Sequence, residues 1–278
     1  MSLRNKITSV QLTDVGRVRE HNEDAIGTNP DLGLLVLADG MGGYNAGEVA
    51  SGIAVRTTLE FVSSACEHAD RAALDPGTRM MRQSIILRDA IARANKIIHQ
   101  TAKSQRQCEG MGTTIVALLF HDNRVSIAHV GDSRIYRLRN GQLSLLTRDD
   151  SILNDQIELG LIDAQDAGDS HNRHMVTQAL GNHPQVTAHV QEEELCSGDV
   201  YLLCTDGLTD LVDEKDIEQI VDALKTNLPL TASHLVQLAN DCGGYDNVTI
   251  ALIRVLDTPP PAIPEKSLLQ RLFDWLGL

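Results

Sequence analysis

Residues 34–43 read Leu-Leu-Val-Leu-Ala-Asp-Gly-Met-Gly-Gly, an apolar run that stops at one carboxylate and is followed by glycines. The run is too short for a typical helix and suits a buried strand. Asp39 is therefore expected where a strand leaves the core, and the glycines predict a sharp turn of the backbone after it. A carboxylate fixed at the end of a strand, beside a glycine whose carbonyl is free, is well placed to bind a cation.

Repetition of this pattern favours a metal site over the simple turn that a single Asp-Gly pair would predict. Apolar strands also end at Asp132 and Asp206, and Asp246 comes just before the apolar strand 248–253. Residues 22–24, Asn-Glu-Asp, add two adjacent acids near the start of the chain. Acids at the ends of buried strands, spread over the whole chain, predict one shared oxygen-rich site for hard divalent cations.

The composition excludes several classes of protein. The net charge of −14, from 24 basic and 38 acidic residues, argues against a nucleic-acid surface, which needs a basic stripe. The five cysteines form no C-x-x-C pair, and their odd number favours reduced thiols over a disulfide framework or a zinc site. No apolar signal segment and no stretch long enough to span a membrane is present, so a cytoplasmic protein is expected.

Apolar runs and helical periodicity together predict an α+β domain with antiparallel sheets inside and helices outside. The Asn140-Gly141 pair between two runs is a strong hairpin signal, which makes the middle of the chain antiparallel. The expected strands cover residues 7–15, 25–28, 34–38, 113–120, 124–130, 134–139, 142–146, 186–195, 199–204 and 248–255. The expected helices cover residues 45–66, 82–103, 149–160, 214–225 and 231–242.

The chain is expected to form one domain over residues 1–257. Within it, residues 163–173 are polar and poorly patterned, which predicts a mobile surface segment. The proline-rich stretch 258–264 predicts a stiff linker. Apolar residues then repeat at helical spacing over 268–276, so a short amphipathic helix is expected to pack back on the domain or on a partner protein. Linker and helix together form a tail, residues 258–278.

An oxygen-rich site of this kind suits phosphoryl transfer. Two divalent ions held about 3.5–4 Å apart by shared carboxylates lower the pKa of a bridging water toward ~7 and neutralise charge on the phosphoryl oxygens. Such a site also needs a basic residue to hold the incoming phosphate. Arg19 lies close in sequence to Glu23 and Asp24, and the planar fork of an arginine can bind two phosphate oxygens at once.

Six motifs in order make the sequence resemble the metal-dependent type-2C protein serine/threonine phosphatases, and among them the compact bacterial branch. The resemblance covers about Thr8 to Val255. Each motif is weak by itself, whereas six in order over one domain are a specific signal. The motifs are Arg19-x-x-x-Glu23-Asp24, Ala38-Asp39-Gly40-Met41-Gly42-Gly43, Gly112-Thr113-Thr114, His129-Val130-Gly131-Asp132-Ser133-Arg134, Thr205-Asp206-Gly207-Leu208 and Asp246-Asn247.

The resemblance implies a four-layer α-β-β-α sandwich, in which two antiparallel sheets are flanked by helix pairs and a cleft at one edge holds two Mn²⁺ or Mg²⁺ ions. It implies hydrolysis of phosphoserine and phosphothreonine in proteins by attack of a metal-bridging water. The expected partners are phosphorylated proteins and an opposing bacterial serine/threonine kinase, and the expected state is a monomer. Two alternatives stay open, a phosphatase dedicated to one regulator or secretion-system component, and an inactive relative that only binds phosphoproteins.

The resemblance also implies the ligands of the two main ions. Asp39 corresponds to the carboxylate that bridges them, and Gly40 to the residue whose carbonyl binds one of them. Asp206 and Asp246 correspond to the remaining direct ligands. The segment 150–174 corresponds to the variable flap of the family, which gates substrate.

Four further residues receive roles in the same way. Glu23 and Asp24 correspond to acids that hold metal-bound water, and Arg19 to the arginine that binds phosphate. Asp132 corresponds, with Asp206, to the weaker third-metal site of bacterial members. For Asp132 the plainer alternative is a residue that caps a turn, and for Glu23 it is a solvated side chain.

Two positions depart from the family pattern and leave the general acid unidentified. Met41 and Tyr44 stand where different branches of the family carry histidine. A serine alkoxide is a poor leaving group, so a donor is needed. Metal-bound water is the first candidate, and His171 or His174 is the second. Other histidines, among them His189, are expected to be surface or packing residues.

Overall fold

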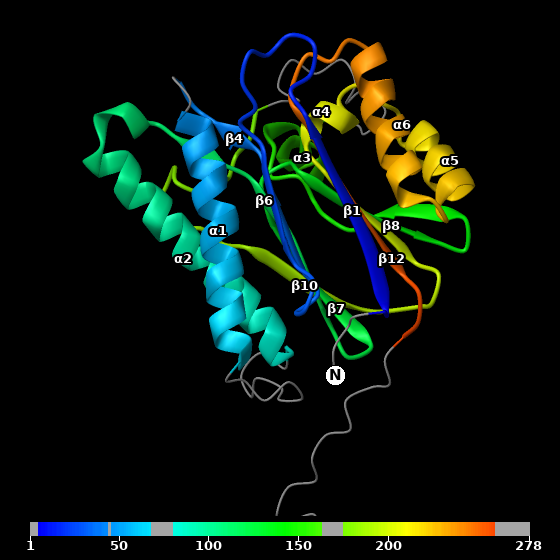
Figure 1. The fold of residues 1–278 in the computed structure, drawn as a ribbon. Helices are drawn as coiled ribbons and strands as arrows, with labels where there is room; N and C mark the ends of the chain where they lie inside the picture. The colour runs from blue at the N-terminus through cyan, green and yellow to red at the C-terminus, as the bar shows by residue number, and fades with distance from the viewer. Residues whose placement is uncertain (1–4, 44–45, 68–79, 163–174, 259–278) are drawn as a thin grey trace, which may run out of the picture.

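In the computed structural model, which describes residues 5–43, 46–67, 80–162 and 175–258, two five-stranded antiparallel sheets lie face to face (Figure 1). The first sheet has the order β1-β12-β11-β8-β9, and the second has the order β10-β7-β6-β3-β2. The first sheet contains β1 (Ile7–Asp14), β12 (Val248–Val255), β11 (Val200–Cys204), β8 (Arg134–Arg139) and β9 (Gln142–Leu145). The second contains β10 (His189–Glu194), β7 (Arg124–Val130), β6 (Ile115–His121), β3 (Leu34–Ala38) and β2 (Ala25–Asn29).

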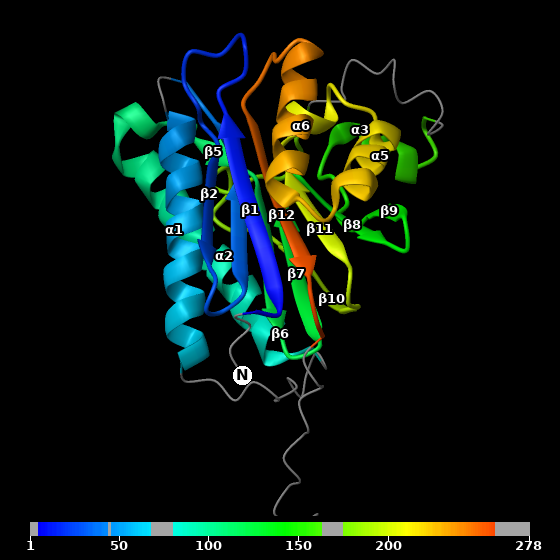
Figure 2. The ribbon, with the colours of Figure 1, turned by 45° about the vertical axis from the view of Figure 1, so that its right-hand side comes forward.

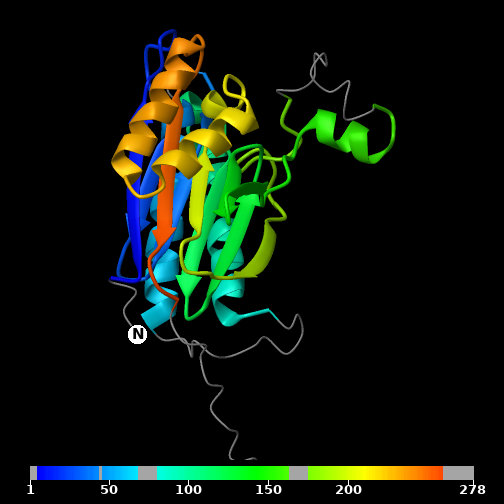
Figure 3. The same cartoon turned by 90° about the vertical axis from the view of Figure 1, so that its right-hand side faces the viewer.

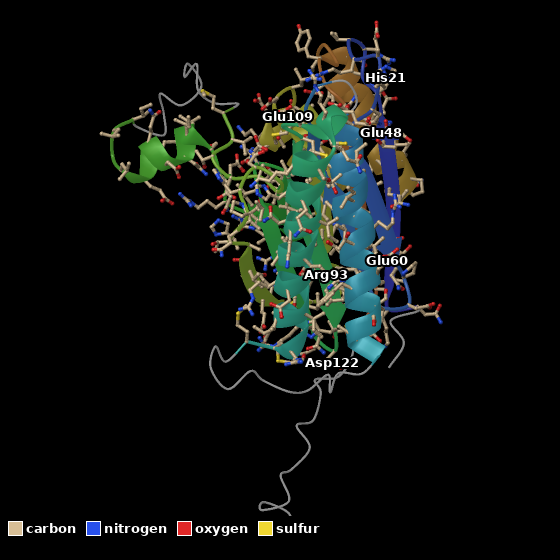
Figure 4. The ribbon with its side chains drawn as sticks, turned by 90° about the vertical axis from the view of Figure 1, so that its left-hand side faces the viewer. His21, Glu48, Glu60, Arg93, Glu109 and Asp122 are labelled. Carbon is tan, nitrogen blue, oxygen red and sulfur yellow. The ribbon has the colours of Figure 1, made fainter. Side chains whose placement is uncertain are left out.

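A pair of helices covers the outer face of each sheet (Figure 2). Helices α1 (Ala46–Glu67) and α2 (Arg82–Ser104) pack on the second sheet, and α5 (Glu214–Leu224) and α6 (Leu228–Asp241) pack on the first. Figure 4 shows α1 and α2 side by side, and the Arg93 guanidinium of α2 lies 5.8 Å from the ring centroid of Phe61 in α1. The predicted four-layer α-β-β-α sandwich is confirmed.

The apolar run 34–38 is buried on both faces. All five residues of β3 are buried; Leu35 and Leu37 point into the core between the sheets, whereas Leu34, Val36 and Ala38 point toward the helices. Successive side chains of a strand alternate between its faces, so a strand covered on both faces reads as a continuous apolar run. The run therefore ends at Asp39, where the chain leaves β3.

The turn predicted after Asp39 is in fact a short strand. Residues Gly40–Met41 form β4, which pairs with β5 (Gly112–Thr113). In the sequence, β4 comes before α1 and β5 comes after α2. A Cβ atom on Gly40 would overlap the carbonyl oxygens of Glu23 and Gly47. Glycine is needed here for a close approach of three backbone segments, and the turn itself comes later, at Gly42 with φ of +152°.

One helix boundary and one additional helix also differ from the prediction. Helix α6 begins at Leu228, three residues earlier than expected, because Asn227 caps it by accepting a hydrogen bond from the Leu230 N–H and because proline is tolerated in the first turn. The four-residue helix α4 (Asp206–Thr209) was not predicted at all. Helix α3 (Ile152–Glu158) falls inside the predicted range 149–160.

Several predictions concern residues outside the described part of the chain. These are the segment 163–173, the tail beyond residue 258 with its helix, and the side chains of Tyr44, His171 and His174. Among the described helices, none combines the length and the apolar character that a membrane crossing requires.

Candidate active site

One cleft of about 610 Å³ gathers the acids that the sequence singled out. It lies at the end of the sandwich where β3 and β11 finish and β12 begins; Figure 2 shows β1 ending and β12 starting at this same end. All five predicted metal residues line it, with two of the three predicted catalytic residues. The lining includes Arg19, Glu23, Asp39, Gly40, Met41, Asp132, Asp206, Asp210, Tyr245, Asp246 and Asn247.

The backbone of Asp39 is fixed on both sides by Thr113, the last residue of β5, and by Thr114, which follows it. The Asp39 N–H donates to the Thr114 hydroxyl at 3.1 Å, and the Asp39 carbonyl accepts from the Thr113 hydroxyl at 2.7 Å and from the Thr114 N–H at 2.9 Å. With the main chain held in this way, the carboxylate projects into the cleft from a rigid support.

Burial and crowding both keep protons on the carboxyl groups. The pKa of Asp39 is raised well above its ordinary value, first by burial and then by the charges of Asp24, Asp206 and Asp132. Burial, with the charge of Asp206 as a smaller cause, raises the pKa of Asp132 to about 7. Like charges gathered in a poorly hydrated cleft cannot all ionise without a counter-charge.

Asp24 lies beneath the cleft, beside the end of β11. Its Oδ2 accepts a hydrogen bond from the Thr205 hydroxyl at 3.1 Å, while its buried Oδ1 has no hydrogen-bond partner among the described residues. Burial raises the pKa of Asp24 to about 7. A buried carboxylate oxygen without a donor is a costly arrangement, and a water or cation in the cleft would relieve it.

Arg19 and Asp246 face each other across the opening of the cleft. The Arg19 Nη2 donates to Asp246 Oδ2 at 2.6 Å, and this hydrogen bond raises the pKa of the guanidinium. The Arg19 side chain is 52% exposed, so it is free to swing toward an incoming phosphate. The other oxygen of Asp246 accepts from the N–H of Asn247 at 2.8 Å.

Asn247 ties the loop that carries Arg19 and Glu23 to the start of β12. Its Oδ1 accepts from the Glu23 N–H at 2.8 Å, and its Nδ2 donates to the carbonyls of Val15 at 3.0 Å and His21 at 2.9 Å. Sequence reasoning noted the Asp-Asn pair without assigning a task to the amide. In the sequence, the only sign of a role for Asn247 is its position directly after Asp246, a predicted metal ligand.

Glu23 is held at the cleft by its backbone as well as by its side chain. The Glu23 carbonyl accepts from the Ser51 hydroxyl of α1 at 2.6 Å. A Cβ atom on Gly47 of the same helix would lie 2.8 Å from the Glu23 Cδ, so the carboxyl group rests directly on the helix. Burial raises the pKa of Glu23, which indicates a partly desolvated side chain and argues against the alternative of a merely solvated one.

The donor set fits hard divalent cations that keep part of their hydration shell. Every acidic group lining the cleft offers carboxylate oxygens, and no histidine or cysteine lies among the described lining residues. Within the described residues, no three His, Cys, Asp or Glu side chains come close enough to hold an ion by themselves. Mg²⁺ and chemically similar ions are ordinarily bound by one or two carboxylates and several waters, so the carboxylate oxygens of the cleft are of the type that suits them.

An acidic cleft with one arginine at its mouth, on a rigid two-sheet sandwich, defines a hydrolase that uses divalent cations on phosphate esters. Residues 16–240 match the family model described as protein phosphatase 2C, and the chain belongs to this family of metal-dependent serine/threonine phosphatases.

Three relatives illustrate the match. The chain is 37% identical to the serine/threonine protein phosphatase PstP of Mycobacterium tuberculosis over 246 residues, which cover 88% of this chain and 44% of that protein. It is 37% identical to the serine/threonine phosphatase stp of Listeria monocytogenes over 247 residues, covering 87% of this chain and 93% of that protein. The crystal structure of the PstP catalytic domain, in complex with two manganese ions, superposes with a TM-score of 0.76 at 33% identity and covers 90% of this chain and 99% of that one.

Proposed function

We propose that this chain hydrolyses phosphoserine and phosphothreonine in proteins with the help of two divalent cations, Mn²⁺ or Mg²⁺. The observation that carries the proposal is the convergence of Asp39, Asp206 and Asp246 on one cleft with Arg19 at its mouth. These acids come from three strand ends that are far apart in the sequence, and a shared cation is the simplest reason for bringing them together. Family membership supports the same reaction class.

The proposed ligands are the carboxylates of Asp39, Asp206 and Asp246 and the carbonyl of Gly40. Asp132, beside Asp206, would serve a third, weaker site. When bound, such cations lower the pKa of water and neutralise charge on the phosphoryl oxygens. The raised pKa values of the acids support this assignment, because cations supply the missing counter-charge.

The remaining residues orient the reactants. Arg19 would leave Asp246 and bind two oxygens of the phosphoryl group through its planar fork. Glu23, which lines the cleft, and Asp24, which lies beside it, would accept hydrogen bonds from water bound to the cations. Met41 has no proton to give, and no histidine lines the described cleft. We keep water as the first candidate for the donor to the departing serine or threonine oxygen; His171 and His174, the second candidates, lie outside the described residues.

The same proposal extends to the cellular setting. No disulfide joins any two of the five cysteines, all of which the structure describes, and this suits a reducing compartment such as the cytoplasm. An opposing serine/threonine kinase follows from the reaction, because a phosphoprotein substrate needs a source of phosphate. A monomer suffices, because the acids and the arginine of the cleft all come from one chain.

The decisive experiment compares turnover with and without metal. With p-nitrophenyl phosphate and with a phosphothreonine peptide, we expect hydrolysis that requires Mn²⁺, stops on addition of a chelator and returns with excess Mn²⁺. Binding of the phosphopeptide without metal-dependent release of phosphate would overturn the proposal and favour a phosphoprotein-binding module.

A further inference from the structure

Asp150 is a buried carboxylate at the root of the segment that carries α3, and it does not line the cleft. Its side chain is 7% exposed. Figures 3 and 4 show α3 standing apart from the two sheets, so the chain leaves the domain just after Asp150. A carboxylate buried where the chain leaves the two sheets requires hydrogen-bond partners, and those partners indicate its role.

Three different segments meet the carboxylate of Asp150. Its Oδ2 accepts from the Gly131 N–H at 2.9 Å and from the Gln178 amide at 3.1 Å. Its Oδ1 contacts His189 Nε2 at 3.0 Å. Both oxygens are therefore used, and the three partners belong to the turn after β7, the chain returning from the segment, and the start of β10.

The main chain of Asp150 joins the same pieces. Its N–H donates to the Gly131 carbonyl at 3.0 Å, and its carbonyl accepts from the Thr177 N–H at 2.7 Å. Two residues after Asp150, the Ile152 N–H donates to the Met175 carbonyl at 2.9 Å. The outgoing stem of the segment is thus bonded to the returning stem and to the turn at Gly131.

The turn at Gly131 leads directly to the cleft. Gly131 has φ of +99°, and a Cβ atom on it would lie 2.7 Å from the side chain of Thr114. That same Thr114 accepts the hydrogen bond from the Asp39 N–H. The residue after Gly131 is Asp132, so a shift of this turn would move one carboxylate directly and another through Thr114.

The returning stem also reaches the cleft. Gln178 is held in place by two hydrogen bonds of 3.1 Å with the backbone of Thr187. Val176, two residues earlier, lines the cleft, and Leu180, two residues later, exchanges backbone hydrogen bonds with Thr113. Thr113 in turn donates to the Asp39 carbonyl.

His189, the first residue of β10, is the partner of Asp150 that comes from the second sheet. It lies opposite His129 in the β10–β7 pairing, and the two rings stack with centroids 4.8 Å apart and planes 18° apart. The stack fixes the direction in which His189 faces Asp150. The expectation that His189 is only a surface or packing residue is therefore too narrow.

We propose that Asp150 is a positioning residue, whose carboxylate holds the Gly131–Asp132 turn and both stems of the α3 segment in one arrangement. The proposal rests on the proposed function for its catalytic consequence, because Asp132 matters to turnover only if the cleft binds cations. The arrangement itself is independent of activity.

The test uses graded variants and a matched control. Asp150→Ala removes all three side-chain contacts, His189→Ala removes one, and Asp150→Asn keeps the shape and one acceptor oxygen. Asp199→Ala is the control, because Asp199 is also a buried aspartate with three hydrogen bonds, to Arg139 at 2.8 and 2.7 Å and to the Cys196 N–H at 2.8 Å. It lies at the opposite end of β11 from Asp206.

Amide hydrogen exchange of the full chain gives a readout that needs no turnover. We expect Asp150→Ala to speed exchange in peptides covering 129–133 and 175–181, with smaller effects for His189→Ala and Asp150→Asn. Asp199→Ala should lower the melting temperature while leaving exchange in those peptides unchanged. Equal acceleration throughout the domain in Asp150→Ala and in Asp150→Asn would mean a merely structural acid and would overturn the proposal.

Mn²⁺ titration and kinetics complete the test. Calorimetric titration with Mn²⁺ should show affinity lowered by about 10-fold in Asp150→Ala, the size usual for residues that orient metal ligands, and retained in Asp199→Ala. kcat for the phosphothreonine peptide should fall in parallel. Unchanged Mn²⁺ binding together with unchanged local exchange would refute the positioning role. An inactive wild type with the expected exchange pattern would instead refute only the proposed function.

Discussion

Asp39 illustrates a conflict between stability and chemistry within a single side chain. Its backbone is hydrogen-bonded to Thr113 and Thr114, and this places the carboxylate among its acidic neighbours. The raised pKa of this group records the free energy that the fold gives up to keep an acid there. Residues of this kind serve binding and weaken the empty protein.

Replacing Asp39 by asparagine should therefore have two opposite effects. The metal-free protein should melt at a higher temperature near pH 7.5, by about 2–4 °C for each kcal/mol of repulsion removed. Turnover with Mn²⁺ should fall by more than about 100-fold, since even residues that only orient metal ligands are worth roughly 10–100-fold.

Differential scanning calorimetry and steady-state kinetics measure these two effects. Asp89→Asn is the control, because Asp89 is an exposed acid on α2 that pairs with Arg88. This variant should change neither quantity. Activity retained in Asp39→Asn would remove that carboxylate from the proposed set of ligands.

Arg19→Ala should chiefly weaken substrate binding. A charge-assisted hydrogen bond is worth about 1.5–3 kcal/mol, and the exposed position of Arg19 places it at the lower end, so KM should rise about 10-fold. Arg19→Lys should recover only part of the loss, because an ammonium cannot bind two oxygens in one plane. Kinetics at saturating Mn²⁺ decide the matter; a fall in kcat at constant KM would assign Arg19 to the transition state alone.

At the scale of elements, local patterns predicted the strands and helices and missed the contacts between distant segments. The strands 124–130 and 134–139 and the hairpin at Asn140-Gly141 have the predicted bounds, because periodicity and turn residues are local. β4 was missed because its partner, Gly112–Thr113, lies some seventy residues away. The division into two sheets flanked by helix pairs came only from the family resemblance, and the order of the strands was not predicted, since no local pattern contains it.

The same limit explains what could be predicted about the site. Asp39, Asp132 and Asp206 stood out because each follows an apolar run, and Asp246 because it comes just before one, which is visible in the sequence. Asn247 and Asp150 did not stand out, because their roles depend on partners such as Val15 and His189, which come from other parts of the chain. The cleft was therefore predictable, whereas the residues that support it were not.

Helix α1 offers a matched pair of glycines for a test at this scale. A Cβ atom on Gly47 would lie 2.8 Å from Glu23 and from the Gly40 backbone, whereas one on Gly52 would meet nothing within 4 Å. Gly52→Ala should stabilise the protein by about 0.5–1 kcal/mol through helix propensity alone and leave activity unchanged. Gly47→Ala should lower the melting temperature and reduce turnover, because it displaces the wall of the cleft. Equal behaviour of the two variants in calorimetry and kinetics would contradict the packing described for α1.

For the whole molecule, the acids of the cleft are part of a net charge of −14. Self-repulsion of this size favours solubility and opposes compaction, and the cleft concentrates part of it where water is scarce. Cations in the cleft would lower both the local and the overall repulsion. The stability of this fold is therefore expected to depend on pH and on bound cations.

The change of stability with pH follows from Asp24 and Asp132. Their pKa values in the folded protein, about 7, lie above the ordinary value of 3.8. Their contribution to stability is fully present below about pH 4 and is lost as the pH rises through about 7, because the unfolded chain releases these protons first. Cations favour the ionised carboxylates, so stabilisation by Mn²⁺ should increase over the same range.

The melting temperature with Mn²⁺ minus that with a chelator isolates this effect. His129, whose pKa burial lowers to about 4, titrates with the opposite sign, yet it lies outside the cleft and contributes equally to both measurements. We expect the difference to grow from about pH 5.5 to about pH 7.5, and to grow less in Asp132→Asn. A difference that stays constant or narrows over this range would mean that the acids of the cleft are not where the cations bind.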